Sequence, residues 1–125
     1  MVFSLKSKAS TPAERIIIID PSNGTATFGG GELTAASYIP VGISIDSVST
    51  NGSVPIKGVG EIARLAFNDT ITAGTWFTSD ANGKGIPFTG AVTNTTHIAG
   101  IALATVVSTG SVIDVLFQPM ANNLV

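Results

Sequence analysis

The chain has 125 residues, of which 44% are hydrophobic and only 11% are charged. Soluble domains carry about 25% charged residues on average, and disordered chains lack this much apolar material, so the composition excludes intrinsic disorder. No apolar run approaches the roughly 18 residues of a membrane-spanning helix, which predicts no membrane partner. The net charge of −2 and the scattered basic residues exclude the basic stripe of a nucleic-acid-binding protein. Cysteine is absent, which excludes disulfides and thiolate metal sites.

The first residues differ from the rest of the chain. Residues 1–14 are mostly polar, contain Pro12 and offer few side chains that could form a core. We therefore expect an extended N-terminal arm over 1–14 and a β domain over 15–125. The first apolar run, Ile16–Ile19, is too short for a signal peptide, which predicts synthesis in the cytoplasm.

After the arm, short runs rich in Ile, Val, Thr and Phe recur about every ten residues, separated by glycine-containing turns. This spacing predicts an all-β fold, a small compact β-sandwich or β-barrel with at most one short helix. Glu32–Tyr38 is the one window that favours a helix, and Glu61–Ala66 fits either a strand or a helix. The expected strands are Arg15–Ile19, Thr25–Phe28, Val41–Val48, Ser53–Lys57, Glu61–Phe67, Thr75–Thr78, Ile86–Phe88, Ile98–Val107 and Val112–Phe117. Type I′ turns are expected at Asn23-Gly24, Asn51-Gly52 and Asn82-Gly83.

A repeat emerges when the chain is aligned with itself. Gly42-Ile43-Ser44-Ile45 matches Gly100-Ile101-Ala102-Leu103, and without a gap Gly52-Ser53-Val54 then falls on Gly110-Ser111-Val112. The match predicts two similar β units, about 38–60 and 97–119, although chance similarity between simple β sequences is an alternative. Strand alternation places Ile43 and Ile45 on one face of a strand, and Ile101 and Leu103 on one face of the equivalent strand.

The sequence offers little catalytic chemistry, which predicts that the protein is not an enzyme. His97 is the only histidine and lies in a polar stretch, so a surface role is favoured over a catalytic or metal-binding one. The stretch Asp80–Gly85 resembles a calcium loop but lacks its closing glutamate, which favours a hairpin turn. Trp76, the only tryptophan, is expected in the core. No metal and no cofactor are expected.

From Ala73 onward the chain resembles the capsid decoration, or cement, proteins of tailed bacteriophages. The resemblance rests on Ala73-Gly74, the stretch Asp80–Lys84, the strand Ile98–Leu103 and the final Thr109–Leu116, with Gly52–Val59 similar to the family's central strand. It covers Val41 to Phe117 and consists of β-turn patterns of moderate specificity. The N-terminal forty residues have no clear counterpart in the family.

The resemblance implies a virion structural protein without a cofactor. Such a protein binds the outer surface of the phage head and stabilises the lattice of major capsid proteins, commonly as a homotrimer. A different virion component, such as a receptor- or carbohydrate-binding β module, is the alternative, and it would predict clustered exposed aromatic residues.

The arm supplies a hypothesis for attachment. An extended segment can become ordered along a neighbouring subunit by adding backbone hydrogen bonds to a sheet edge. We expect apolar contacts with the capsid from Val2, Phe3 and Leu5, and contacts from Lys6 and Lys8 with an acidic capsid surface.

Overall fold

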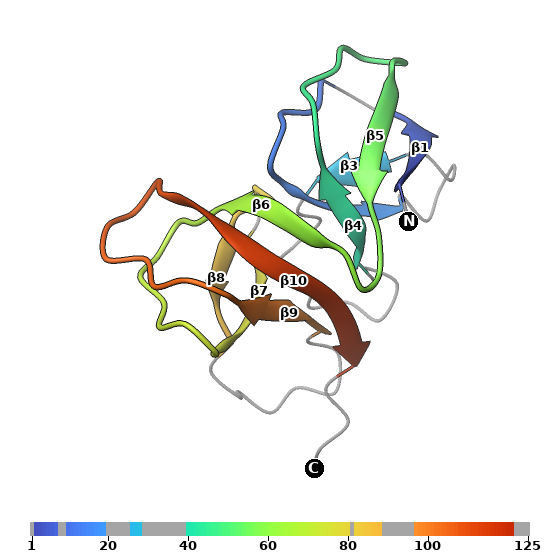
Figure 1. The fold of residues 1–125 in the computed structure, drawn as a ribbon. Helices are drawn as coiled ribbons and strands as arrows, with labels where there is room; N and C mark the ends of the chain where they lie inside the picture. The colour runs from blue at the N-terminus through green and yellow to red at the C-terminus, as the bar shows by residue number, and fades with distance from the viewer. Residues whose placement is uncertain are drawn as a thin grey trace.

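In the computed structural model, the structure describes residues 2–7, 10–19, 26–28, 40–80, 82–88 and 97–121. Within these ranges the protein is all-β and contains no helix, which confirms the predicted fold class. Ten strands form two five-stranded antiparallel sheets that lie side by side (Figure 1). None of the described segments is a helix long and apolar enough to cross a membrane.

Each sheet is built from consecutive strands, so we refer to residues 2–57 as the first unit and 62–121 as the second unit. The first unit has strand order β1-β5-β4-β2-β3 and the second has β6-β10-β9-β7-β8. The first five strands are β1 (Val2–Lys6), β2 (Ile16–Ile19), β3 (Ala26–Phe28), β4 (Pro40–Ser44) and β5 (Ser53–Lys57). The second five are β6 (Ile62–Ala66), β7 (Trp76–Ser79), β8 (Gly85–Pro87), β9 (His97–Ala102) and β10 (Val112–Ala121).

All nine expected strands overlap observed ones, but two of them end early. β4 stops at Ser44 and β9 at Ala102, because the chain bends away there before the bridges at Val48 and Val106. Ile43 lies within β4 and is buried, whereas Ile45 lies just beyond the end of the strand and is exposed. The ambiguous Glu61–Ala66 is strand β6. The helical window Glu32–Tyr38 and the turn at Asn23-Gly24 lie outside the described residues.

The expected N-terminal arm is part of the first sheet. Residues Val2–Lys6 form β1, which pairs along its whole length with β5. Phe3 and Leu5 are half-buried and pack against Val54 and Ile56. The prediction of an arm that does not pack on its own domain is therefore wrong. The alternation of Phe3 and Leu5 with polar residues gives β1 one apolar face, and β5 supplies the backbone partner that holds β1 in the sheet.

The two units follow the same path, strand for strand. When β1 to β5 are matched with β6 to β10 in sequence order, the two sheet orders become identical. The registers agree as well, because Ile16 pairs with Ile43 in the first unit and Trp76 pairs with Ile101 in the second. The outermost pairs correspond in the same way, namely Val2↔Lys57 and Ile62↔Leu116. The correspondence therefore extends over nearly all described residues, well beyond the two segments that the sequence aligns.

The connecting segments also correspond, and they show that the gapless alignment is out of step by one residue. The N–H of Asn51 donates to the Ser7 carbonyl at 3.0 Å, and the N–H of Gly110 donates to the Phe67 carbonyl at 2.7 Å. Asn51 and Gly110 both have positive φ, 65° and 85°. Asn51 thus corresponds to Gly110, so Gly52-Ser53-Val54 corresponds to Ser111-Val112-Ile113.

The turn chemistry agrees only in part with the sequence. The Asn51-Gly52 turn is closed by a hydrogen bond from the Gly52 N–H to the Ser49 carbonyl at 2.9 Å. Because Asn51 alone has positive φ there, this is not the expected type I′ turn. In the Asn82-Gly83 turn, only Gly83 has positive φ.

Two glycines make the close approach of neighbouring strands possible. A Cβ on Gly42 would collide with the Lys57 carbonyl and the Ile56 side chain, and a Cβ on Gly100 would collide with the Leu116 carbonyl. These two glycines occupy equivalent positions of β4 and β9, where the sequence alignment also pairs them. The Gly-Ile pair shared by the two strands therefore has a steric reason.

Candidate interaction surfaces

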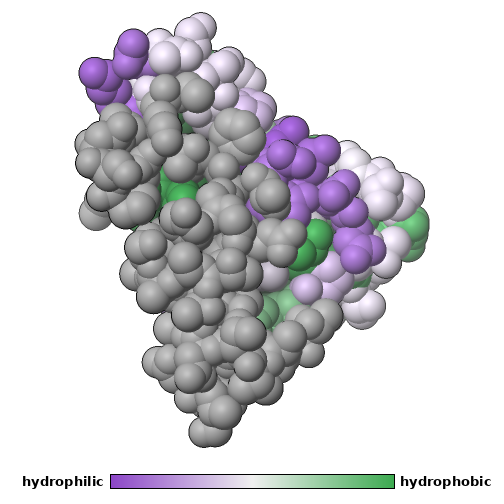
Figure 2. Space-filling view, turned by 180° about the vertical axis from the view of Figure 1, so that it is seen from behind, coloured by the Kyte–Doolittle hydropathy of each residue, from purple (hydrophilic) through white to green (hydrophobic). Residues whose placement is uncertain are grey.

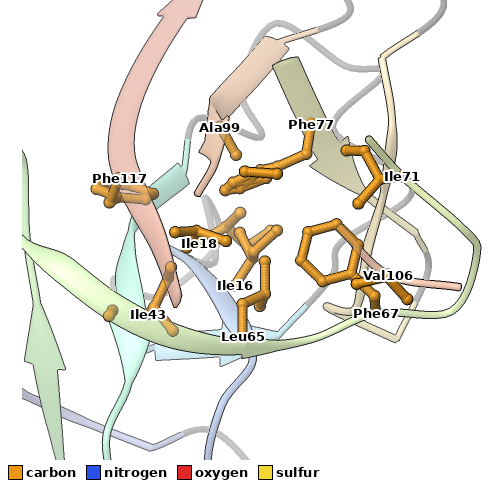
Figure 3. Packing of buried hydrophobic residues seen from close by; sticks show 13 residues of the cluster. Ile16, Ile18, Ile43, Leu65, Phe67, Ile71, Phe77, Ala99, Val106 and Phe117 are labelled. Carbon is orange, nitrogen blue, oxygen red and sulfur yellow. The ribbon is translucent and has the colours of Figure 1, made fainter. Parts of the chain in front are cut away.

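The main hydrophobic core lies between the two units. Figure 3 shows Ile16, Ile18 and Ile43 of the first unit pointing into a cluster formed by the second unit. We call Ile16 and Ile43, which are directly paired and fully buried, the docked row. We call the side of the second sheet that covers the docked row the inner face of the second unit. It carries Leu65, Phe67, Phe77, Ala99, Val115 and Phe117.

Polar contacts fix how the first unit sits on the second. The Ile16 N–H donates to the Gly83 carbonyl at 2.8 Å, and the Ala66 N–H donates to the Glu14 carbonyl at 3.1 Å. The Glu14 carboxylate also lies 3.6 Å from Nε of Arg64. The backbone bonds orient the docked row, whereas this half-exposed ion pair adds little stability.

The second unit presents the equivalent row on its outer face, and there it is open. Cross-strand pairing places Ile62, Leu116, Ile101 and Trp76 next to one another across β6, β10, β9 and β7, and we call these four the open row. Directly opposed residues of antiparallel strands lie on one face of the sheet. Ile62 is 54% exposed and Trp76 37%, while Ile101 and Leu116 are half-buried.

Trp76 is not a core residue, which corrects the prediction from the sequence. It occupies the position equivalent to Ile16, whose side chain is completely buried in the docked row. The neighbouring Phe77 points to the inner face instead and packs against Phe67, with ring centroids 5.7 Å apart. The local sequence is the same kind of strand in both units, and the difference in exposure comes from what covers each outer face.

The residues expected to contact a capsid lie on or beside β1, at the edge of the first sheet. Lys6 is exposed, whereas Phe3 and Leu5 are half-buried against the core of the first unit. The side chain of Val2 and all of Lys8 lie outside the described residues. The structure thus brings Phe3, Leu5 and Lys6 together on one edge strand but directs the two apolar side chains inward.

The calcium-like stretch Asp80–Gly85 is accounted for by local structure. Oδ1 of Asp80 accepts the N–H groups of Asn82 at 2.8 Å and Lys84 at 2.9 Å, so this carboxylate closes the β7–β8 turn as expected for a hairpin. His97 begins β9, and its side chain lies outside the described residues. Among the described residues, no three histidine, aspartate or glutamate side chains are grouped as metal ligands.

The surface also carries a wide, shallow hollow of about 490 Å³ on the second unit. It is lined by Thr70, Thr72, Thr75, Thr105, Pro87 and Val107, among others. None of its lining residues is aromatic or charged, so it lacks the stacking surface that a carbohydrate site usually offers. Seen from behind, the described residues show small separate apolar areas beside polar ones (Figure 2).

The fold places the chain among all-β proteins built from two similar five-stranded antiparallel units. No family model and no curated protein sequence matches it. Among solved structures, the chain is similar to the N base of the head fiber protein gp8.5 of bacteriophage phi29, with a TM-score of 0.67 and 14% sequence identity. The alignment covers 94% of this chain and 93% of the phi29 chain. At this identity the likeness establishes the shared fold.

Sequence reasoning missed the open row. Its four members are separated in the chain by up to 54 positions, as the distance from Ile62 to Leu116 shows. Only the strand order and the register bring them together. The signal available in the sequence was the alternation in β7 and β10, which indicates two faces but does not say which one is covered.

Proposed function

We propose that the protein is a virion structural component that decorates the outer surface of a phage head and contacts the major capsid protein there. The observation that carries this proposal is the fold shared with the phi29 head fiber base over nearly the whole of both chains. The decoration-protein resemblance of Val41 to Phe117 supports it independently. In this role the protein acts as a homo-oligomer, with a trimer favoured, and uses no catalysis and no cofactor.

The physical character of the chain fits this role. Low charge and a high apolar fraction suit permanent interfaces, which resemble a protein core more than a free surface. Engaging several capsid subunits at once raises the apparent affinity through a high local concentration, even when each contact is modest. The described residues supply apolar faces and sheet edges for this purpose.

Attachment through the edge of β1 remains our proposal for the capsid contact, but the structure changes the roles that we assign to its residues. Phe3 and Leu5 stabilise the first unit, so the exposed ammonium of Lys6 is the group in β1 that is offered to an acidic capsid surface. Lys8 is included through its place in the sequence alone.

The test is binding of the purified protein to phage heads that lack it, followed by co-sedimentation. We expect saturable binding to the outside of the heads, and at least about tenfold weaker binding for Lys6→Glu, equivalent to 1.4 kcal/mol. Lys84→Glu is the matched control, because it makes the same charge change in the β7–β8 turn of the other unit. Absence of saturable binding by the wild-type protein would contradict the proposed function. Equal binding of Lys6→Glu would remove β1 from the contact.

A further inference from the structure

We infer that the open row is a second docking surface for the major capsid protein, and that it takes an extended apolar segment with an acidic residue at one end. The inference rests on the proposed function and deepens it, because it names a contact surface and the chemistry of the segment that fits it. Its starting point is the unequal burial of equivalent positions. Ile16 and Ile43 of the docked row are fully buried, whereas Trp76 and Ile101 lie on the outer face of the second unit and are partly exposed.

The apolar surface crosses the whole second sheet. Phe88, just after β8, continues the open row beyond β7, because Phe77 pairs with Pro87 one step earlier. The N–H of Phe88 donates to the Trp76 carbonyl at 3.0 Å, so a second aromatic residue lies next to the tryptophan. The exposed Leu103 lies beside the row at the end of β9. Single exposed apolar residues are ordinary, but a continuous row that contains a tryptophan is typical of the centre of an interface.

A second copy of this chain offers no free face of the kind that covers the docked row. Within the chain that cover is the inner face of the second unit, which the docked row already occupies. The equivalent face of the first unit is closed as well, since Ile17, Val54 and Ile56 in its cluster are 0% exposed. We therefore assign the cover of the open row to another protein, and the proposed function makes the capsid protein that partner.

The β6 end of the open row carries a positive charge. Nζ of Lys57 donates to the Ile62 carbonyl at 3.1 Å, which holds the ammonium beside the outermost residue of the row. Between described residues the one ion pair joins Arg64 to Glu14, so the ammonium of Lys57 has no carboxylate partner among them. A carboxylate on the docked segment would complement this charge, and complementary charges at an interface select the partner and fix its register.

A small pocket at this end gives the carboxylate a place to enter. It has a volume of about 150 Å³ and lies where the first unit meets β6. Its lining residues are Glu14, Ser44, Ile45, Lys57, Ala63 and Arg64. Lys57 and Arg64 bring two positive charges and Glu14 brings one negative charge, while the exposed Ile45 supplies an apolar wall. The excess of positive charge favours an acidic side chain over a basic one.

The length of the row sets the length of the segment. From β6 to β7 the row crosses three gaps between neighbouring strands, a span of about 14 Å, which equals roughly four or five residues of extended chain. Such a segment places apolar side chains over Leu116 and Ile101 and its acidic residue beside Lys57. It needs no strand edge, so this contact differs in kind from the edge contact proposed for β1.

Two contact surfaces allow one molecule to hold two capsid subunits together. Lys6 pairs with Ser53 at one end of the β1–β5 ladder, whereas Lys57 pairs with Val2 at the other end, which adjoins the second unit. The β1 edge thus belongs to the first unit and the open row to the second. A molecule attached through both surfaces dissociates only when both contacts are open, so its apparent affinity exceeds that of either contact alone.

The first experiment measures binding of the full chain to phage heads that lack the protein, by co-sedimentation, with Ile101→Lys in the centre of the open row. We expect at least about tenfold weaker binding, equivalent to 1.4 kcal/mol, because a charge replaces an apolar contact. Val107→Lys is the matched control: Val107 is 82% exposed but lies outside the row, and this variant should bind like the wild type. If Ile101→Lys does not fold, Trp76→Thr replaces it, since threonine suits an exposed strand position.

The acidic character of the segment is tested at Lys57. Lys57→Gln removes the charge but keeps an N–H group for the Ile62 carbonyl. We expect about threefold to fivefold weaker binding to heads at low salt, as for an exposed ion pair, and a smaller difference at high salt. Lys84→Gln makes the same change in the β7–β8 turn and should bind like the wild type. A Lys57→Gln variant that binds as tightly as the wild type would overturn the acidic partner.

The results separate this inference from the proposed function. If the wild type does not bind heads, the proposed function fails. If the wild type binds, and Lys6→Glu weakens binding whereas Ile101→Lys does not, this inference alone is overturned. Sedimentation velocity of the free protein tests the other occupant. A wild type that associates, together with an Ile101→Lys variant that needs about tenfold higher concentration to do so, would assign the row to a second copy and overturn the inference as well.

Discussion

The two units of this protein have the same strand order and register, yet equivalent rows of side chains are buried in the first unit and exposed in the second. The first unit inserts Ile16 and Ile43 into the second, while the second leaves Trp76 and Ile101 uncovered. The sequences follow this difference. β2 is Ile-Ile-Ile-Ile, as expected for a strand covered on both sides, whereas β7 is Trp-Phe-Thr-Ser, in which Trp76 is exposed and the three residues after it are buried. Burial here is set by how the units dock, and strand composition has adapted to it.

The largest effect should come from removing residues 1–14. Without β1 the first unit loses Phe3 and Leu5, and the inner cluster around Val54 and Ile56 is opened to water. We expect the free energy of unfolding to fall by about 4 kcal/mol or more, from roughly 2 kcal/mol for each lost apolar side chain. Urea denaturation measures this, with Lys6→Glu as a control of unchanged stability. A truncated protein as stable as the full chain would mean that β1 does not belong to the first sheet.

Alanine at the two equivalent isoleucines tests the comparison at a single position. Ile43→Ala should lower the free energy of unfolding by about 2–5 kcal/mol, because it leaves a cavity between the units. Ile101→Ala should cost less than about 1 kcal/mol in the monomer, since this half-buried side chain lies on the open face. Chemical denaturation at low protein concentration gives both values. Equal losses would contradict the assignment of one row as docked and the other as open.

The paired glycines should behave alike in both units. Gly42→Ala and Gly100→Ala each force a methyl group against a neighbouring strand, and we expect losses of about 1–3 kcal/mol from overpacking. Thermal unfolding of the two variants provides the measurement. If one substitution were tolerated freely, the two units would not share the close strand approach that their registers indicate.

The smallest effect concerns the loop that precedes β10. Gly110 has a φ of 85°, and no atom outside its chain neighbours lies within 4 Å of the place that a methyl group would take, so Gly110→Ala tests backbone conformation alone. We expect a loss of about 1 kcal/mol, typical of a non-glycine residue in the left-handed region. Thermal unfolding measures it, and Asn51, the counterpart of Gly110, should tolerate glycine without loss. A neutral Gly110→Ala would indicate that the two loops differ in conformation.

Much of this fold can be predicted from the sequence, because β-branched runs and glycine turns recur at regular intervals. Ser53–Lys57 is predicted with its observed bounds, and the Gly-Ile match between β4 and β9 reflects a real equivalence of position. β1 is missed because its two inward side chains, Phe3 and Leu5, form too short a pattern to stand out from polar neighbours.

The candidate site is harder to predict than the strands. Alternation shows that Trp76 and Phe77 face opposite sides of a strand, but it does not show which side another unit covers. Composition assigns the large aromatic Trp76 to the core. In the structure, the equivalent residue of the first unit, Ile16, is the buried one, and Trp76 is 37% exposed. Strand register and unit docking are tertiary properties, so the open row becomes visible only in the structure.

The most direct test of the open row is the accessibility of Trp76, the only tryptophan of the chain. Its fluorescence can be quenched with acrylamide in the dilute folded protein, with the urea-unfolded chain measured in parallel. We predict that Trp76 in the folded protein is readily quenched, because its side chain is 37% exposed in the open row. A tryptophan that is shielded in the folded protein and becomes accessible only on unfolding would contradict an open row.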